Sequence, residues 1–380
     1  MGRQSVRYLI LIMAFVSSCS SDKQTKDGLV YIDVSKNYPE KGIQLEDFAD
    51  IEYVQLEFDE DFLFSEVPAI VTANYMIICR FIAGDILIFT RDGKPYTKFN
   101  HKGNGPGEYA YIEKLLYDEA SDEFFVLSNN KLLVYSSSGA FRKVIPLRDG
   151  FSNMIPLGVI VNYDSISLLL YEQHNLYPTR FSLISKVDGS MVDSIQISKG
   201  EEIELYVLSQ DKAFALLAPS YPMVKYKDGY LLTDFSIDTV FYLSGEKELS
   251  PILVRKPAIQ SMDPVIYMNS FVEAGNYEFV SVITVTNENN RLPRTYLMRD
   301  RKTGSIYKQK ITFNDYRGKE VYLSPETINN TQNSKSGLIV LGLAELQNAN
   351  NENKLSGKLK ELVDNSDEDG NDIYMLLHFK

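Results

Sequence analysis

Short hydrophobic runs, each ended by turn residues, recur along most of this 380-residue chain. The stretch from Ser65 to Tyr109 shows the pattern most clearly, because it holds several runs rich in Val, Ile, Tyr and Phe. These residue types favour β-strands, and Asp92-Gly93 between the last two runs suits a tight hairpin. The pattern predicts an antiparallel meander with strands at 68–72, 75–80, 86–90 and 96–99.

The same unit, a strand followed by a glycine turn and a second strand, returns along the chain. The turn glycines lie about 46 to 59 residues apart: Gly93, Gly139, Gly189, Gly245 and Gly304. Periods of roughly 40 to 50 residues with four strands each are typical of propeller blades. The sequence therefore predicts an all-β fold, a six-bladed β-propeller of four-stranded antiparallel blades.

The later blades are less regular than the first. Blade four has five strand candidates, so one of them is wrong or belongs to a connection. In blade six, strands are expected at 321–324, 337–343 and 373–379. Leucines at helical spacing predict a short helical insertion at about 344–363, on the edge or face of the propeller, before the closing C-terminal strand. Residues 29–34 are expected to pair with the final blade and close the ring.

Composition and charge narrow the class of protein. Hydrophobic residues make up 44% of the chain and charged residues 24%, as in globular proteins. The formal net charge is −12, and removal of residues 1–18, which contain Arg3 and Arg7 but no acid, would make it −14. Because such a surface repels phosphate groups, nucleic acid is not an expected partner.

The N-terminus predicts export. Residues 1–18 have a basic start and an apolar run that is too short to span a bilayer, as in a signal peptide. The segment Val16-Ser17-Ser18-Cys19 resembles a bacterial lipobox, which implies that Cys19 carries a lipid and begins the mature chain. Residues 19–28 would then form a lipidated tether, and 29–380 the propeller. The alternative is an ordinary secretory signal that happens to precede a cysteine.

The residue after the lipobox cysteine and the other cysteine add two expectations. By resemblance to bacterial lipoproteins, Ser20 instead of Asp favours delivery to the outer membrane, with the periplasmic or surface face left open. If Cys19 carries lipid, Cys79 has no disulfide partner, and its apolar surroundings predict a buried, inert thiol.

Three segments of the chain resemble those of a known family. The segments HKGNGPGEY (His101 to Tyr109), DTVF (from Asp238) and the closing IYMLLHFK resemble the six-bladed β-propeller lipoproteins of Gram-negative gut bacteria, which are similar to NHL-repeat propellers. The resemblance covers nearly all of the chain after Cys19. It implies the fold and export, and it transfers no catalytic residue.

The glycine-rich motif within this segment is the first candidate site. It comprises Gly103, Gly105, Pro106, Gly107, Glu108 and Tyr109. Open backbone amides in such a loop, together with Arg80, His101, Lys102 and Tyr109, would suit an anionic group. The alternative, which we prefer, is a structural connection between blades one and two.

Metal and cofactor chemistry have weak support. Residues 365–370, with Asp367 and Asp369, match the first half of a calcium loop, but Leu376 stands where the closing Glu should be. A solvated acidic turn is therefore the preferred interpretation. With 3 His in the chain, a His-rich metal centre is not expected, and no cofactor is expected.

These observations favour a lipid-anchored binding or scaffold module for a glycan, peptide or protein partner at the outer membrane. Its ligand is expected at the end of the central channel, where loops converge. The alternative is a carbohydrate-active lyase or hydrolase at the channel mouth. Two facing carboxylates there, or a Tyr beside an Arg or Lys, would favour the enzyme.

Overall fold

A computed structural model describes residues 25–26, 28–65, 70–147, 159–171, 181–198, 200–201, 203–204, 206–329, 331–367 and 370–380. The predicted signal peptide, Cys19 and Asp369 lie outside these residues. Within the described part, no helix combines the length and apolar character needed to cross a membrane.

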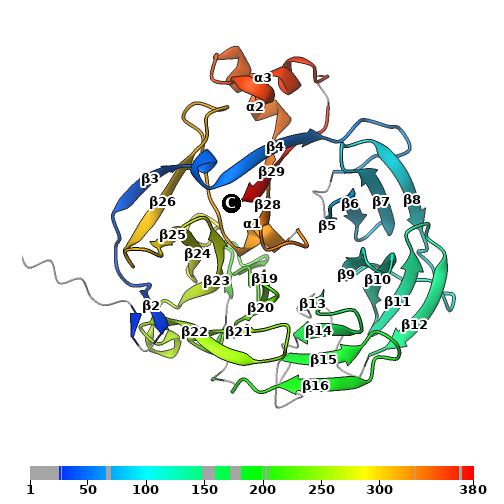
Figure 1. The fold of residues 1–380 in the computed structure, drawn as a ribbon, viewed down its shortest axis with the longest axis horizontal. Coiled ribbons are helices and arrows are strands. Elements are labelled where there is room, and N and C mark those ends of the chain that lie inside the picture. The colour runs from blue at the N-terminus through cyan, green and yellow to red at the C-terminus, as the bar shows by residue number, and fades with distance from the viewer. Residues whose placement is uncertain are drawn as a thin grey trace, which may run out of the picture.

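Six sheets form a ring around a central axis, which confirms the predicted propeller (Figure 1). Blades one to three each contain four antiparallel strands that run from the axis to the rim in sequence order. Blade one contains β5 (Ile70–Val71), β6 (Tyr75–Arg80), β7 (Asp85–Thr90) and β8 (Pro95–Asn100). Blade two contains β9 (Lys114–Asp118), β10 (Glu123–Ser128), β11 (Lys131–Ser136) and β12 (Phe141–Pro146). Blade three contains β13 (Val159–Asn162), β14 (Ser167–Tyr171), β15 (Phe181–Ser185) and β16 (Met191–Ile195).

Blades four and five gain extra strands at the rim from the N-terminal segment. Blade four contains β19 (Met223–Tyr226), β20 (Gly229–Leu232), β21 (Thr239–Leu243) and β22 (Leu249–Lys256). Blade five contains β23 (Ile266–Ala274), β24 (Tyr277–Thr284), β25 (Arg294–Asp300) and β26 (Ile306–Thr312). β2 (Leu29–Asp33), itself paired with β1 (Thr25–Lys26), runs parallel to β22, and β3 (Glu40–Gln44) runs parallel to β26.

The strand that closes the ring is β4 (Ala49–Gln55). It pairs antiparallel with β29 (Ile373–Phe379), which pairs in turn with β28 (Ser336–Leu341) to form blade six. The expectation that residues 29–34 join the final blade is therefore wrong, because that segment lies on blade four. Both N-terminal segments have a strand pattern, and only the tertiary arrangement decides which one reaches β29.

The inner position of blade six is filled in an unusual way. The strand expected at 321–324 is wrong, because β27 (Glu320–Val321) pairs with β26 of blade five. The chain then forms helix α1 (Pro325–Asn329), which lies inside the ring against β28, β19 and β23 (Figure 1). Thr331, just after α1, forms a parallel bridge with Val71 of blade one. α1 and the residues that follow it thus stand where an innermost strand would lie.

The remaining elements are additions to the ring. β17 (Tyr206–Leu208) and β18 (Ala215–Leu217) form a separate hairpin between blades three and four, so the surplus strand candidate of blade four belongs to a connection. The predicted helices before the final strand are confirmed as α2 (Leu343–Asn351) and α3 (Gly357–Asp364), which lie outside the ring near β4 (Figure 1).

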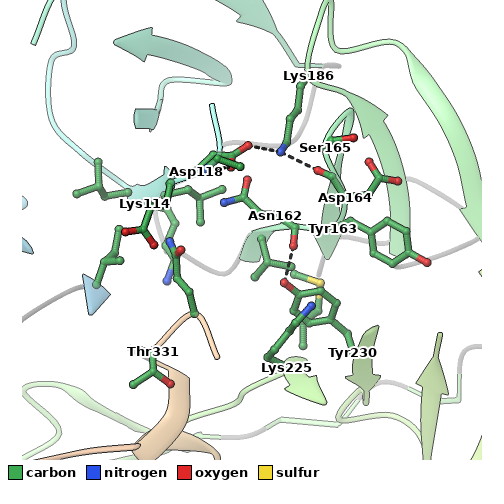
Figure 2. A pocket seen from close by; sticks show the side chains of 18 of the residues that line it. Lys114, Asp118, Asn162, Tyr163, Asp164, Ser165, Lys186, Lys225, Tyr230 and Thr331 are labelled. Atoms are coloured by element: carbon green, nitrogen blue, oxygen red, sulfur yellow. Dashed lines mark hydrogen bonds and ion pairs between the residues drawn. The ribbon is translucent and has the colours of Figure 1, made fainter. Parts of the chain in front are cut away.

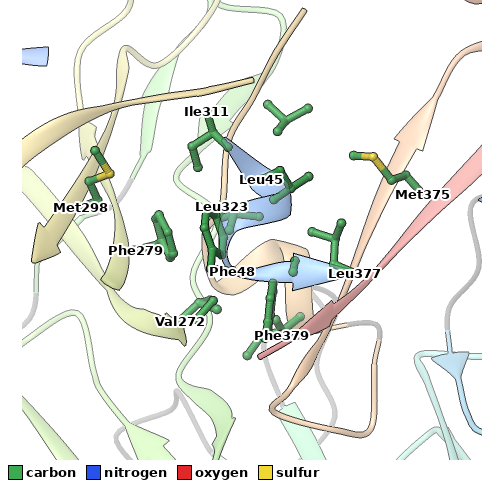
Figure 3. Close-up of a cluster of buried hydrophobic side chains, with 14 of the residues drawn as sticks. Leu45, Phe48, Val272, Phe279, Met298, Ile311, Leu323, Met375, Leu377 and Phe379 are labelled. Carbon is green, nitrogen blue, oxygen red and sulfur yellow. The ribbon is translucent and has the colours of Figure 1, made fainter. Parts of the chain in front are cut away.

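The hydrophobic core consists of side chains packed between neighbouring blades. The largest cluster joins blades four, five and six to the N-terminal segment and to α2 and α3. Figure 3 shows Leu45, the first residue of the single-turn 3-10 helix η1 (Leu45–Asp47), and Phe48, which follows it, between Phe279 of blade five and Leu377 of blade six. Burial of these side chains holds the last blades and the ring-closing segment together.

The repeated turn glycines join the two outer strands of a blade, and three of them touch the preceding blade. Gly93, Gly139 and Gly189 have φ of +93°, +82° and +76°. An added Cβ would lie 2.3 Å from Gln55 O, 2.7 Å from Phe99 Cβ and 2.4 Å from Pro146 O, respectively, each on the outer strand of the preceding blade. Close approach of blades, and not only turn geometry, therefore requires glycine there.

Candidate functional site

A cavity of about 410 Å³ lies at the central channel, lined by the innermost strands of blades one to four and by the segment around α1 (Figure 2). The polar side chains that matter most for its chemistry are Lys114, Asp118, Asn162, Lys186, Lys225 and Tyr230. β9 contributes the first two residues at its two ends, and β19 contributes Lys225. The cavity therefore collects side chains that are far apart in the sequence.

An ion pair between blades two and three neutralises one carboxylate of the cavity. Lys186 Nζ lies 2.6 Å from Asp118 Oδ2 and also donates to the main-chain oxygen of Asp164 at 2.8 Å. Burial of Asp118 favours its neutral form, but the hydrogen bond and charge of Lys186 outweigh burial and hold the pKa of that carboxyl below its usual value. Asp118 therefore stays ionised and paired.

The two other acidic side chains that line the cavity also accept hydrogen bonds from the protein. Asp164 Oδ1 accepts hydrogen bonds from the main-chain amides of Ile166 and Ser167, at 2.9 and 2.6 Å. Glu119 Oε1 accepts from Asn74 Nδ2 at 2.6 Å. The negative charges around the cavity thus have hydrogen-bond partners before any ligand arrives.

Two lysines of the cavity lack such compensation. Among the described residues, neither Lys114 nor Lys225 has a carboxylate within ion-pair distance. Lys225 Nζ lies 4.6 Å from the centroid of the Tyr230 ring, which is a cation–π contact, and no hydrogen bond is found for Lys114 Nζ within the described part. Burial lowers the pKa of both ammonium groups. The cavity therefore presents two lysine amino groups that form no ion pair with the residues the structure describes.

Tyrosines tie blades three and four together beside these lysines. The hydroxyl of Tyr230 donates to the main-chain oxygen of Asn162, and the hydroxyl of Tyr163 donates to the main-chain oxygen of Ser244. Burial raises the pKa of Tyr230, so its phenol stays protonated near neutral pH. Its role in this structure is to fix the cavity wall.

The segment after α1 crosses the channel to blade two. Gln332 Nε2 donates to the main-chain oxygen of Tyr117, which also accepts from Asn162 Nδ2 at 3.1 Å. Together with the bridge between Thr331 and Val71, these bonds hold the segment against blades one and two. This wall of the cavity is therefore anchored to two blades.

A second cavity of about 630 Å³ lies between blades six and one and shares Glu119, Thr331 and Gln332 with the first. Its arginine is already paired, because Arg91 Nη2 lies 2.8 Å from Glu52 Oε2. His378 Nε2 lies 3.0 Å from the same carboxylate oxygen. Although this cavity is larger, its arginine is already paired with Glu52, so the central cavity is the stronger candidate site.

The glycine-rich motif lies away from the central cavity, in the connection between blades one and two. Glu108 Oε2 accepts from the amide of Gly105 at 2.8 Å, and the amide of Gly103 donates to the main-chain oxygen of Tyr109 at 3.0 Å. Gly107 packs against the ring of Phe141, and Pro106 lies within the same turn. The loop therefore folds back on itself.

The other candidate residues surround this loop. The Tyr109 side chain is fully buried; its hydroxyl donates to Gly84 O at 2.7 Å and accepts from the His101 amide at 2.9 Å. His101 Nε2 lies 2.7 Å from Gly139 O, and Lys102 Nζ donates to Ile82 O at 2.7 Å. Arg80 pairs with Asp85 at 3.0 Å. The structure places the four predicted residues around this loop, each with at least one hydrogen bond or ion pair to the protein, and their role in ligand binding stays a prediction.

Asp367 and Cys79 are the remaining residues to which the sequence drew attention. Asp367 is exposed, and no group of three or more His, Cys, Asp or Glu side chains suited to a metal is found within the described ranges. Cys79, on β6, is buried as expected and is in no disulfide with the described residues.

Sequence reasoning missed the residues of the central cavity. Lys114 and Lys225 are lysines beside apolar residues in the short strands KLLYD and MVKY, and this contrast is the only sequence signal that could have identified them. Their meeting in one cavity depends on the closed ring, which no local pattern encodes.

Comparisons with known proteins agree with this fold. A protein of Bacteroides fragilis that is named for its predicted export has 16% sequence identity and a TM-score of 0.64, with 93% of this chain and 99% of that chain covered. A member of the DUF4221 family from Bacteroides vulgatus has 11% identity and a TM-score of 0.53, with 88% and 99% covered. No match is found among curated proteins. Residues 29–378 match the profile of a family described as "Domain of unknown function (DUF4934)", and the chain belongs to that family.

Proposed function

We propose that this chain is an exported, lipid-anchored binding module that takes a small ligand in its central cavity. The observation that carries the proposal is the cavity itself, about 410 Å³ in volume and lined by polar side chains from four blades. Ligand pockets of proteins are typically concave sites of about 300–1,000 Å³ with a few convergent polar groups. A glycan or a short peptide is the class of ligand that the sequence predicts.

Export is supported by the lipobox and by the name of the Bacteroides fragilis protein with the same fold. The proposed anchor is a lipid on Cys19, which would hold the propeller at the outer membrane through the tether that follows. The test is metabolic labelling with a radioactive fatty acid in a Gram-negative host. Label on the wild type that is absent from Cys19→Ala supports the anchor, and equal labelling of the two contradicts it.

Ligand binding is tested with residues 20–380, which retain every residue that the structure describes. A ligand that binds only the native state raises the melting temperature, so a thermal-shift screen of oligosaccharides and peptides can identify one. Ala120 is exposed and lines the cavity, so Ala120→Trp should obstruct it. Ala213, exposed on the β17–β18 hairpin, provides the control Ala213→Trp. Loss of the ligand-dependent shift in the first variant alone is expected, and an equal shift in both would contradict the proposal.

A lyase or hydrolase is a second candidate, because a tyrosine does lie beside a lysine in the cavity. The Tyr230 hydroxyl, however, donates to a main-chain carbonyl, and burial raises its pKa, which makes it a poor base at neutral pH. Incubation of any glycan that binds with the protein, followed by product analysis, separates the two functions. Turnover that Tyr230→Phe abolishes while binding persists would favour the enzyme.

A further inference from the structure

We propose that the ligand of the central cavity is a small organic anion, whose negative group is held by the ammonium groups of Lys114 and Lys225. This inference rests on the proposed function and narrows it to a chemical class. Lys114 begins β9 of blade two, and Lys225 lies on β19 of blade four, so the two charges approach the cavity from different blades (Figure 2). A ligand that contacts both would bridge the channel.

The charge distribution in the cavity points to an anion instead of a cation. Its lining contains three lysines and three acids, so the total charge alone decides nothing. The acids differ from the lysines in their partners, because Asp118 is paired with Lys186 while Asp164 and Glu119 accept hydrogen bonds from the fold. Only Lys114 and Lys225, among the charged lining residues, form no ion pair or hydrogen bond with the described part of the chain, and the Asp228 carboxylate acts on Lys225 only from beyond ion-pair distance.

Leaving two ammonium groups uncompensated in a partly buried site is costly for the folded protein. Burial of a charge is unfavourable unless an opposite charge or hydrogen bonds compensate it. Because burial disfavours the charged form of an amino group, it lowers the pKa of both lysines. A bound carboxylate or sulfate would supply the missing acceptors through charge-assisted hydrogen bonds, which are stronger than neutral ones.

The positive charge that these two lysines can carry contrasts with the net negative charge of the protein. The chain carries a net charge of −12, so the protein as a whole repels anions at long range. Attraction for an anion must therefore be local to the cavity, where a dielectric constant below that of bulk water strengthens it. Hydroxyl and carboxylate groups at the edge of the cavity, such as those of Ser165 and Asp164, can in addition accept hydrogen bonds from ligand hydroxyls. Sugar acids combine both features and are the first probes to test.

The experiment compares acidic compounds with neutral counterparts of the same shape, using residues 20–380. Digalacturonate and galactobiose form one pair, and glucuronate and glucose form a second; succinate and sulfate extend the set of anions. Affinities are measured by calorimetry at low ionic strength, since salt weakens such interactions. We expect at least one anion to bind and its neutral counterpart to bind at least about tenfold more weakly.

Variants assign the effect to the two lysines. Lys114→Met and Lys225→Met should each weaken anion binding by about tenfold or more, while Lys302→Met, at an exposed position outside the cavity, should leave it unchanged. The melting temperature without ligand shows whether each variant is folded. Equal affinity of the wild type and the two cavity variants would overturn the inference.

The outcomes separate this inference from the function on which it rests. If a neutral ligand binds, and Ala120→Trp prevents it while anions do not bind, the cavity is a binding site and the anion inference is wrong. If neither neutral nor anionic compounds bind, both the inference and the proposed function fail.

Discussion

Lys186 Nζ lies 2.6 Å from Asp118 Oδ2, and the two side chains are only 9% and 12% exposed. The lysine follows the third strand of blade three, and the aspartate ends the innermost strand of blade two. The pair therefore joins two blades at the edge of the central cavity. Because Lys186 and Asp118 bind each other, their charges are already compensated when a ligand arrives. What remains for a ligand is the pair of uncompensated lysines, Lys114 and Lys225.

Removing Lys186 should destabilise the protein strongly. Lys186→Met leaves the buried Asp118 carboxylate without its partner, and loss of one member of a buried ion pair typically costs about 3–5 kcal/mol. The measurement is the free energy of unfolding in urea at pH 7. The pKa of Asp118 is lowered in the folded state, so the stabilisation is present above the usual pKa of Asp and should be lost as the pH falls below it.

Two comparisons control this prediction. The double variant with Asp118→Asn should recover part of the lost stability, because no unpaired charge then remains. Lys94 and Asp92 form an exposed pair, with side chains 61% and 65% exposed, so Lys94→Met should change the free energy of unfolding much less than Lys186→Met does. Equal losses for Lys186→Met and Lys94→Met would show that the buried pair does not stabilise the blades.

Removing Lys114 should have the opposite effect on stability. Burial lowers the pKa of Lys114, so the unfolded chain binds more protons than the folded protein between that lowered value and the usual lysine pKa of 10.5. Wild-type stability therefore rises with pH in this window. Lys114→Met should have a higher melting temperature than the wild type at pH 7, and the difference should shrink toward pH 10.5.

The control for this pH dependence is again Lys302→Met, whose side chain is exposed. It should follow the wild type at every pH. A Lys114→Met variant that is less stable than the wild type at pH 7 would mean that Lys114 supports the fold, and that its charge is not a burden in the absence of a ligand.

Two turn glycines with the same backbone conformation should respond differently to alanine. Gly189 and Gly304 both have φ of +76°, so the backbone strain of alanine is matched, on the order of 1 kcal/mol. An added Cβ at Gly189 would lie 2.4 Å from Pro146 O, whereas none of the atoms described lies within 4 Å of one at Gly304. Gly189→Ala should therefore cost about 1–3 kcal/mol more than Gly304→Ala in urea unfolding. Equal costs would show that contact between blades does not constrain the turn.

The hydroxyl of Tyr109 should matter for stability and not for binding in the cavity. Tyr109→Phe would leave Gly84 O and the His101 amide without their partner, at a cost of about 1–3 kcal/mol. Burial raises the pKa of Tyr109 to about 12, so this effect should not change between pH 6 and 9. Thermal shifts with the bound ligand measure the second half of the prediction. Loss of binding with unchanged stability would instead support the glycine-rich loop as the ligand site.

The blades could be predicted from the sequence because their signals are local. Apolar runs and turn glycines such as Gly93 and Gly139 recur in blades one to five, and within each of these blades consecutive strands pair with each other. The route of the N-terminal segment could not be predicted in this way. β2 and β4 have similar strand patterns, and the choice between blade four and blade six depends on contacts such as those of Leu45 and Phe48 with distant blades (Figure 3).

The candidate site illustrates the same limit. The sequence drew attention to His101, Lys102 and Tyr109 because they flank a distinctive motif, and these residues are bonded to the main chain in the connection between two blades. Lys114 and Lys225 belong to no distinctive sequence motif, because a single lysine in a short strand is common. Ring closure alone brings them to one cavity.

The most direct test of the central claim is a crystal structure of residues 20–380 with the acidic compound that binds most tightly. The account predicts the anionic group of the ligand in the central cavity, within hydrogen-bond distance of Lys114 Nζ and Lys225 Nζ. Density for the ligand beside His101 and Lys102, or in the second cavity beside Arg91, with the central cavity free of it, would contradict the account.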